Sequence, residues 1–242
     1  MASKIIVDQV QKSGGTAFTL PSADGAADTF MKTDGSGTLS FASAAAGFVE
    51  MRVFTAGTTW NRPTGVTKVV VEVAGAGGSG CKASSPQTRH GGGGGGYARK
   101  FIDVSSIATS TLTIGTGGAA VADGAGTGAG SAGGTSSWAD GTNTITCTGG
   151  DGGSLTADQM SNGGTATGGD INIPGGRTAA NWDYGFYGGS HPLGTAGQGN
   201  FSTVGVTKYY NAGGYGAGGG AGGDPSGSGA GAPGVIIVWE YK

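Results

Sequence analysis

Residues 66–80 read VTKVVVEVAGAGGSG, and the change of composition within this stretch decides the fold. Val69, Val71 and Val73 share one face, while Lys68, Val70 and Glu72 share the other, a pattern typical of a β-strand with one buried face. After Ala74 the large side chains stop, and glycine dominates as far as Gly80. The sequence therefore predicts a strand over 66–74 that runs directly into a glycine-rich segment.

Apolar strands bracket the glycine-rich region on both sides. Residues 48–55 and 66–74 precede it, and residues 235–241, VIIVWEY, follow it without a single glycine. Two shorter apolar stretches, 101–104 and 112–114, lie inside it. Residues 57–65 are expected to form a loop whose Trp60 covers the edge of a core. This arrangement predicts that the glycine-rich region folds back between strands.

Glycine content restricts how the region between the strands can be ordered. The chain has 57 glycines and 7 prolines in 242 residues, so glycine is about 24%, against roughly 7% in ordinary proteins. Glycine does not recur at every third position, which excludes collagen, and so much interior glycine disfavours helices. Runs such as 91–96 and 213–220 suit polyproline II helices, which glycine lets approach closely enough to hydrogen-bond laterally. A flexible low-complexity segment is the alternative.

The resulting fold class is mostly β with extensive glycine-rich coil and essentially no α-helix. Short N-terminal strands precede a small β-sandwich-like domain that encloses packed glycine helices of the polyproline II type. Residues 1–47 are expected to form short strands joined by turns, with a linker or short helix over 42–47, and to contain too few apolar residues for a core of their own. They are therefore expected to order against other chains, and residues 48–242 form the glycine-rich distal domain.

Charge and cysteine content narrow the partners. The formal net charge is −2 and the 13 basic residues are spread along the chain, so nucleic-acid binding is not expected. No apolar run approaches the length of a membrane span, and the N-terminal residues lack the apolar segment of a secretory signal. Cys81 and Cys147 are expected to be free buried thiols, although a single bridge is an alternative.

The sequence contains motifs that resemble catalytic or cofactor sites but lack the necessary context. Residues 75–80 match G-x-G-x-x-G, yet the residues that follow cannot form the helix that a dinucleotide site requires. His90 and His191 are the only histidines and the two cysteines are not closely spaced, so no metal site is expected. Several aspartates stand directly before glycine, as at 34, 123, 140 and 151, which turn formation explains. We therefore expect neither enzyme activity nor a cofactor.

Large side chains interrupt the glycines at a few places, and these interruptions are the candidate binding loops. The two richest are residues 177–193 and 200–211, and lesser ones are 82–90, 136–146 and 155–162. Aromatic and polar side chains held on a rigid scaffold are suited to recognising sugars or protein loops. Packing of the same aromatics against one another or at a trimer interface is the alternative. The candidate receptor-binding residues are Arg177, Asn181, Trp182, Asp183, Tyr184, Phe186, Tyr187, His191, Phe201, Lys208, Tyr209 and Tyr210.

The order of motifs over residues 48–242 resembles the glycine-rich domain common in tailed-bacteriophage fibre proteins. Its elements are an aromatic residue, a tryptophan and a proline, a valine-rich strand, glycine runs and a closing apolar strand. Here they correspond to Phe54, Trp60, Pro63, 69–73, 75–78, 91–97, 112–118 and 231–241. Residues 18–25 and 31–41 are similar to repeats of phage fibre shafts, although that pattern usually ends in tryptophan and this chain has Phe41.

The resemblance implies a virion protein made in the host cytoplasm, a tail fibre or fibre tip. Residues 1–47 would join other tail or capsid proteins, or form the shaft of a homotrimer. The distal domain would bind a host surface glycan or outer-membrane protein without covalent chemistry and without membrane insertion. A purely structural component, such as a head fibre or capsid decoration protein, is the alternative reading.

Overall fold

The computed structural model describes residues 9–11, 13–15, 17–23, 25–26, 29–43, 47–83, 89–124, 126–156, 160–178, 187–199, 211–223 and 226–242. The chain divides into two compact units, Met1–Gly47 and Phe48–Lys242. All regular structure in these described ranges is β, and none of it is helical. Consequently, no helix there is long and apolar enough to cross a membrane.

The first unit consists of two small antiparallel hairpins. β1 (Gln9–Val10) pairs with β2 (Phe18–Thr19), and β3 (Thr29–Thr33) pairs with β4 (Leu39–Ser43). The turn before β4 is built by Asp34, whose carboxylate accepts hydrogen bonds from the backbone N–H groups of Ser36 and Thr38. Gly35 takes the positive φ of 85° that this turn requires. None of the described residues in this unit is buried.

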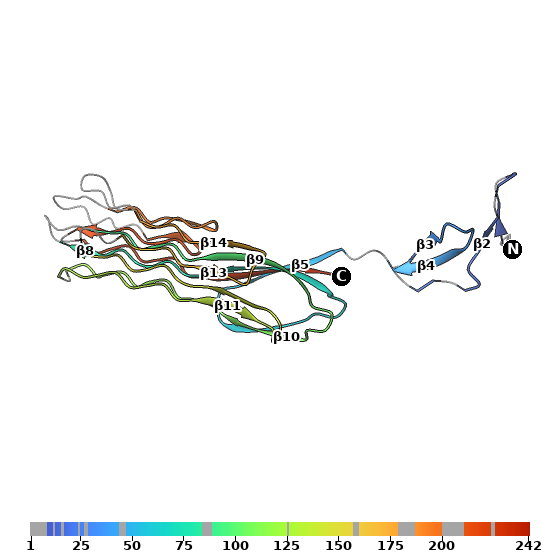
Figure 1. Cartoon of the computed structure of the whole chain (residues 1–242), viewed down its shortest axis with the longest axis horizontal. Helices are drawn as coiled ribbons and strands as arrows, with labels where there is room; N and C mark the ends of the chain where they lie inside the picture. Colours follow the sequence, from blue (N-terminus) through green and yellow to red (C-terminus); the bar gives the residue numbers. More distant parts are fainter. Residues whose placement is uncertain are drawn as a thin grey trace, which may run out of the picture. The chain divides into compact units, whose positions relative to one another are not determined.

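Two five-stranded antiparallel sheets form one end of the second unit (Figure 1). The first sheet has the order β14-β9-β7-β18-β5, and the second has the order β13-β12-β11-β10-β6. The first comprises Ile171–Ile173 (β14), Tyr97–Asp103 (β9), Lys68–Ala74 (β7), Val235–Tyr241 (β18) and Phe48–Phe54 (β5). The second comprises Ala166–Thr167 (β13), Thr144–Cys147 (β12), Ser136–Ala139 (β11), Thr109–Thr113 (β10) and Thr58–Asn61 (β6).

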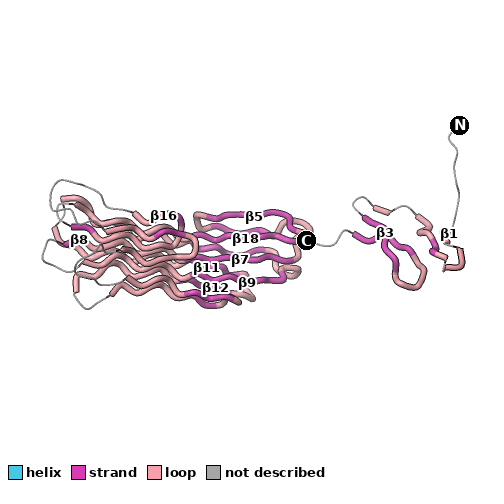
Figure 2. The backbone as a smooth tube through the Cα atoms, turned by 90° about the horizontal axis from the view of Figure 1, so that it is seen from above, coloured by secondary structure: helices cyan, strands magenta, loops and turns pink. Residues whose placement is uncertain are grey.

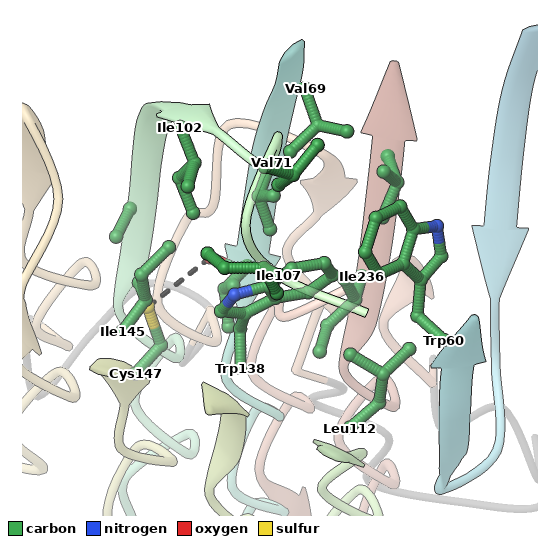
Figure 3. Close-up of a cluster of buried hydrophobic side chains, with 14 of the residues drawn as sticks. Trp60, Val69, Val71, Ile102, Ile107, Leu112, Trp138, Ile145, Cys147 and Ile236 are labelled. Atoms are coloured by element: carbon green, nitrogen blue, oxygen red, sulfur yellow. Dashed lines mark hydrogen bonds between the residues drawn. The ribbon is translucent and has the colours of Figure 1, made fainter. Parts of the chain in front are cut away.

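The hydrophobic core lies between these two sheets (Figure 3). As the alternation predicts, Val69, Val71 and Val73 of β7 are buried, while Val70 and Glu72 are only partly so. The second sheet contributes Trp60 and Trp138, whose rings lie 5.3 Å apart and are fully buried. Trp60 Nε1–H donates a hydrogen bond of 2.8 Å to Oε1 of Glu240, which is also fully buried. The core therefore contains a fully buried indole–carboxylate pair among mostly apolar side chains.

Two regions expected to be loops are strands of the second sheet. Residues 58–61 form β6, the edge strand of this sheet, which pairs with β10 and buries Trp60 completely in the core. Residues 136–146, expected to be a binding loop, form the β11–β12 hairpin except for its last residue, Cys147. Asp140 builds its turn by accepting backbone hydrogen bonds from Thr142 and Asn143. These predictions were wrong because each strand buries only one or two large side chains among serines and threonines.

Beyond the sheets, extended glycine-rich segments lie side by side, and we call this array the glycine bundle (Figure 2). It comprises the described parts of 75–96, 115–135, 148–165, 174–199 and 211–234. Short strand pairs occur within it: β8 (Lys82–Ala83) with β17 (Gly222–Gly223), and β15 (Gly194–Thr195) with β16 (Gly213–Gly214). Gly214 and Gly216 adopt positive φ values of 70° and 73°. The polyproline II helix expected over 213–220 therefore begins only after the turn at Gly214 and Gly216.

The hydrogen bonds of the central segment, residues 75–82, repeat every three residues. Its backbone N–H groups donate to three different neighbouring segments in rotation, at 2.8–3.0 Å. The donor–acceptor pairs are Gly75–Gly96, Gly78–Gly93 and Cys81–His90; Ala76–Gly134, Ser79–Ser131 and Lys82–Gly128; and Gly77–Ala232 and Gly80–Gly229. Three residues per turn without internal hydrogen bonds is the geometry of polyproline II. The segment is thus a three-fold helix whose bonds are all lateral.

Carbonyl groups of the same segment accept from three further neighbours. Gly77 accepts from Gly118, Gly78 from Gly219, and Ala76 from Gly150. Six segments therefore surround the central one, and nearly all of its backbone polar groups are satisfied without any side chain. The G-x-G-x-x-G motif at 75–80 is the first part of this central segment, which has no helix N-terminus to hold a pyrophosphate.

Close backbone approach explains the glycines. A Cβ atom built on any residue of 91–96 would come closer than 3.0 Å to a backbone carbonyl oxygen of another segment. Gly152 is packed against the backbone of Gly130 in the same way and has no positive φ. Asp151–Gly152 is therefore part of a bundle segment and not the turn expected from sequence, whereas Gly35, Gly124 and Gly141 do have positive φ.

Candidate functional site

Several described segments of the glycine bundle begin or end at the end farthest from the two sheets, where β8 lies (Figure 1). Gly80, Gly220 and Gly229 lie at the same position along the bundle axis. The N–H of Gly80 donates to the carbonyl of Gly229, and the N–H of Gly229 donates to the carbonyl of Gly220. Cys81 donates to His90 at the same end, and His90 Nε2 lies 3.2 Å from the carbonyl oxygen of Thr156. The described stems of the candidate loops therefore converge on one end of a stiff array.

Three of the twelve predicted receptor-binding residues lie in the described part of the chain: Arg177, Tyr187 and His191. Asn181, Trp182, Asp183, Tyr184, Phe186, Phe201, Lys208, Tyr209 and Tyr210 lie outside the described residues. The lesser interruption over 82–90 is likewise described only at its ends, and 155–162 only in part.

Arg177 is exposed and belongs to a ladder of polar side chains on the outside of the bundle. Its Nε and Nη2 atoms donate to Oδ1 of Asn162 at 3.1 and 2.6 Å. The Nδ2 atom of Asn162 donates in turn to Oδ2 of Asp151 at 2.9 Å. A charge-assisted chain of this kind fixes the guanidinium at the surface. Arg177 is thus held in place as a cation next to the end of the described segment 160–178.

A small surface hollow of about 200 Å³ adjoins this ladder. Its lining is mostly polar, and the exposed side chain of Met160 supplies the apolar part. The residues that line it are Asp151, Gly152, Ser154, Met160, Ser161 and Asn162. Acceptors, donors and one flexible apolar side chain in a shallow hollow suit a sugar or a peptide side chain better than a charged cofactor.

Asp151 and Asn162 were not predicted as site residues, although the sequence contains a signal for them. Residues 148, 151 and 154 are Thr, Asp and Ser, spaced by three, and residues 162 and 165 are Asn and Thr. In a three-fold helix this spacing places side chains in one row. Asn162 pairs with Asp151, and Thr165 lies beside Thr148 with their hydroxyl oxygens 3.2 Å apart.

Tyr187 and His191 differ in accessibility. The Tyr187 side chain is 55% exposed, so it is available to a ligand. His191 is only 7% exposed, its Nδ1 accepts a hydrogen bond from the Leu193 N–H, and its ring packs edge-on 6.0 Å from that of Tyr97. The position of His191 therefore matches the packing alternative and not direct contact with a receptor.

Two observations in the part of the chain that the structure describes bear on metal binding and on thiol chemistry. No group of three or more His, Cys, Asp or Glu side chains is placed there to hold a metal ion. Cys81 and Cys147 are both free and buried, as expected. Burial raises the pKa of the Cys81 thiol and raises that of Cys147 to about 12, so neither is a ready nucleophile.

Burial of the two histidines makes the stability of the bundle pH-dependent. Desolvation lowers the pKa of His90 and of His191 below the ordinary 6.5. The unfolded chain therefore takes up protons below about pH 6.5 that the folded chain does not yet bind. The stability that the two neutral histidines contribute should be fully present above that pH. The free energy of unfolding should then fall as the pH drops through 6.5 towards the folded pKa values.

Urea denaturation at pH 7.5 and 5.5 measures this effect. We expect the midpoint of the wild type to fall between the two pH values, and that of the variant His90→Gln/His191→Gln to change less. Asp34, Asp103 and Asp140 have pKa values below 3.8 in the fold, so they titrate outside this window. Equal falls in the wild type and the double variant would assign the pH dependence to other groups.

Comparison with known proteins matches most of the second unit. A family model described as a glycine-rich domain matches residues 54–241, from the end of β5 to the end of β18. A search of curated proteins returned no match for the chain. The matched range includes the second five-stranded sheet, the first sheet apart from residues 48–53 of β5, and the whole glycine bundle.

Proposed function

We propose that this chain, which belongs to the family of glycine-rich domains, is a fibre protein of a tailed bacteriophage that attaches the virion to the host surface. The observation that carries this proposal is the convergence of the described loop stems on one end of the glycine bundle. The loops between these stems contain most of the aromatic side chains of the glycine-rich region. A rigid array with variable loops at one end is a common design for recognition.

The glycine bundle gives the binding loops a stiff support. Lateral hydrogen bonds connect each segment to its neighbours along its length, so the loop stems are fixed relative to one another. Preorganised stems lower the entropic cost of binding. Arg177, anchored by Asn162 and Asp151, and the exposed Tyr187 stand beside these loops as contact residues of matching chemistry.

Binding would be non-covalent and multivalent. Residues 1–47 would join other virion proteins or a trimeric shaft, and each virion would present several copies of the distal loops. Simultaneous engagement raises weak single-site affinity to effective attachment. The ligand would be a host surface glycan or an exposed loop of an outer-membrane protein, since aromatic and polar loops suit both.

Replacement of loop aromatics tests the proposal. We expect Trp182→Ala and Tyr210→Ala to reduce the adsorption of virions to host cells by about tenfold or more, the scale of a lost interface hot spot. The thermal unfolding midpoint should stay unchanged. Thr111→Ala, an exposed position on β10 at the sheet end, is the matched control and should adsorb normally. Unfolding of the aromatic variants would instead support the packing alternative.

Immunogold microscopy of virions with antibodies against residues 177–211 locates the loops on the particle. Label at the distal tips of tail fibres is the expected result. Label over the head would contradict attachment through the tail and favour a head fibre or decoration protein. Virions without label would contradict both readings.

A further inference from the structure

The surface hollow beside the polar ladder is formed by two bundle segments that are hydrogen-bonded to each other. One segment contributes Asp151, Gly152 and Ser154, and the other contributes Met160, Ser161 and Asn162. The N–H of Asp151 donates to the carbonyl oxygen of Asn162 at 2.9 Å, and Oγ of Ser161 donates to the carbonyl oxygen of Gly152 at 3.1 Å. The two walls of the hollow are therefore fixed relative to each other.

The polar ladder also fixes the orientation of the Asn162 amide. Its Oδ1 accepts two hydrogen bonds from Arg177, so its Nδ2 is the atom that faces the carboxylate of Asp151. Nδ2 donates to Oδ2 of Asp151 at 2.9 Å, and the backbone N–H of Asn162 donates to the same oxygen at 3.2 Å. An amide nitrogen carries two hydrogens, so one N–H beside the carboxylate is left for a ligand.

Two acceptors accompany this donor. Asp151 is exposed, and among the described residues none donates a hydrogen bond to its Oδ1. Ser161 lines the hollow although it is only 2% exposed, so it belongs to the floor. Its hydroxyl hydrogen is used on Gly152, and its oxygen keeps the capacity to accept. A ligand in the hollow thus meets one amide donor and two acceptors on neighbouring residues.

The charges around the hollow select against ions. Among the described residues that line it, only Asp151 is charged, and Arg177 at the other end of the ladder carries the opposite charge. A calcium ion takes about six to eight oxygen ligands, and no three His, Cys, Asp or Glu side chains gather in the described part of the chain. The Asp151 carboxylate would repel an anion. The hollow is therefore suited to a neutral polar ligand.

The lining favours a sugar over a peptide. Peptides are bound by adding a strand to a sheet edge, or in apolar and aromatic grooves. None of the residues that line the hollow belongs to a strand, and Met160 is the one large apolar side chain among them. The volume of about 200 Å³ is below the roughly 300–1,000 Å³ of sites for drug-sized molecules. This volume suits a single sugar ring.

Met160 narrows the class of sugar. Its side chain is 45% exposed, unbranched and flexible, and none of the lining residues is aromatic. A thioether of this kind can cover a methyl group but not the whole face of a ring. An acetamido group combines a methyl group with one N–H donor and one carbonyl acceptor. These three features match Met160, Oδ1 of Asp151 and the remaining N–H of Asn162.

We propose that the hollow is a binding subsite for an N-acetylated amino sugar. The acetamido N–H donates to Oδ1 of Asp151, its carbonyl oxygen accepts from Nδ2 of Asn162, and its methyl group contacts Met160. A ring hydroxyl donates to Oγ of Ser161 on the floor. The inference rests on the proposed function for the origin of the sugar, a host surface glycan, and it places the subsite on described residues outside the candidate loops 179–186 and 200–210.

Titration of the full-length chain with N-acetylglucosamine, followed by NMR chemical shifts, tests the subsite. We expect a Kd on the order of 1 mM for the wild type. Glucose, which lacks the acetamido group, should bind about tenfold more weakly. Asp151→Asn should weaken the binding of N-acetylglucosamine about tenfold, because an N–H replaces a charged acceptor. Asp103→Asn, at an exposed position on β9, is the matched control and should bind like the wild type.

Met160→Ala tests the acetamido contact separately from the hydrogen bonds. The preference for N-acetylglucosamine over glucose should fall severalfold in this variant, because the methyl group loses its apolar neighbour. Met51→Ala is the matched control, since Met51 is 44% exposed but lies on β5, and it should keep the preference of the wild type.

Near-ultraviolet circular dichroism of the buried Trp60 and Trp138 verifies that each variant is folded. A wild type that binds N-acetylglucosamine no better than glucose, or a folded Asp151→Asn variant that binds it unchanged, would overturn the proposal. Binding of peptides from a random library that is lost in Asp151→Asn, without binding of the sugar, would overturn it in favour of a peptide site. Virion adsorption is measured separately, so a protein that binds the sugar while its virions fail to adsorb would contradict the proposed function alone.

Discussion

Gly95→Ala is expected to destabilise the second unit by about 3 kcal/mol or more. The new methyl group would overlap the backbone carbonyl of Gly75, and the carbonyl oxygen of Ala76 would also lie within 3.0 Å. Both obstacles are main-chain atoms of the central segment, which is hydrogen-bonded to six neighbours and cannot move alone. Because total stabilities are about 5–15 kcal/mol, this single methyl removes a large fraction.

Gly126→Ala is the matched control for this substitution. Gly126 is exposed, has open space around its Cβ position, and has no positive φ. Alanine should therefore be neutral there, or slightly stabilising through the unfolded state. Urea-induced unfolding, monitored by limited proteolysis, compares the free energies of unfolding of the two variants. If Gly95→Ala and Gly126→Ala unfold within about 0.5 kcal/mol of each other, close backbone packing is not what requires glycine in the bundle.

Trp60→Ala is expected to cost about 4 kcal/mol, the scale of removing a large buried aromatic ring. The ring is fully buried against Trp138, and its N–H is a donor to the buried carboxylate of Glu240. Trp60→Phe separates these two contributions. It keeps an aromatic ring but removes the donor, and a lost hydrogen bond to a charged group costs about 1.5–3 kcal/mol.

Trp138→Phe provides the comparison. The Trp138 N–H donates to Oδ2 of Asp140, which is partly exposed and also accepts from Nδ2 of Asn143. Its loss should cost about 1 kcal/mol. The Glu240 carboxylate has a weaker second partner to replace the lost hydrogen bond. Nη1 of Arg52 lies 3.5 Å from its Oε1, and the Arg52 side chain is partly exposed. Equal losses for the two phenylalanine variants in urea denaturation would contradict a special role for the Trp60–Glu240 pair.

The strands that bracket the glycines could be predicted because aliphatic alternation was visible. β7 and β18 were expected within two residues of their observed bounds, and so was β5. β6 and β11 were missed, since Thr58–Asn61 and Ser136–Ala139 each place one tryptophan among polar residues. A single tryptophan ring there buries a large apolar surface, but one apolar residue does not produce the alternating pattern from which a strand is predicted.

The packed glycine helices were predicted, but not which segments are neighbours. Recognition between segments is carried by main-chain groups, which are the same at every glycine. Neighbours are set by the lengths of the stretches between reversals and by where the sheet strands begin. The Asp151–Asn162–Arg177 ladder was missed for the same reason, because its three residues come from segments whose adjacency the sequence does not show.

The three-residue repeat of the bundle hydrogen bonds also restricts how its length can change. Adding one or two residues to a segment rotates every later N–H group toward the wrong neighbour, whereas adding three restores the rotation and advances the helix by about 9 Å. Neighbouring segments must gain the same increment for their bonds to remain paired. The distance between the sheets and the far end of the bundle can therefore change only in steps, and viable homologues should differ in bundle length by multiples of three residues per segment while their loops vary freely.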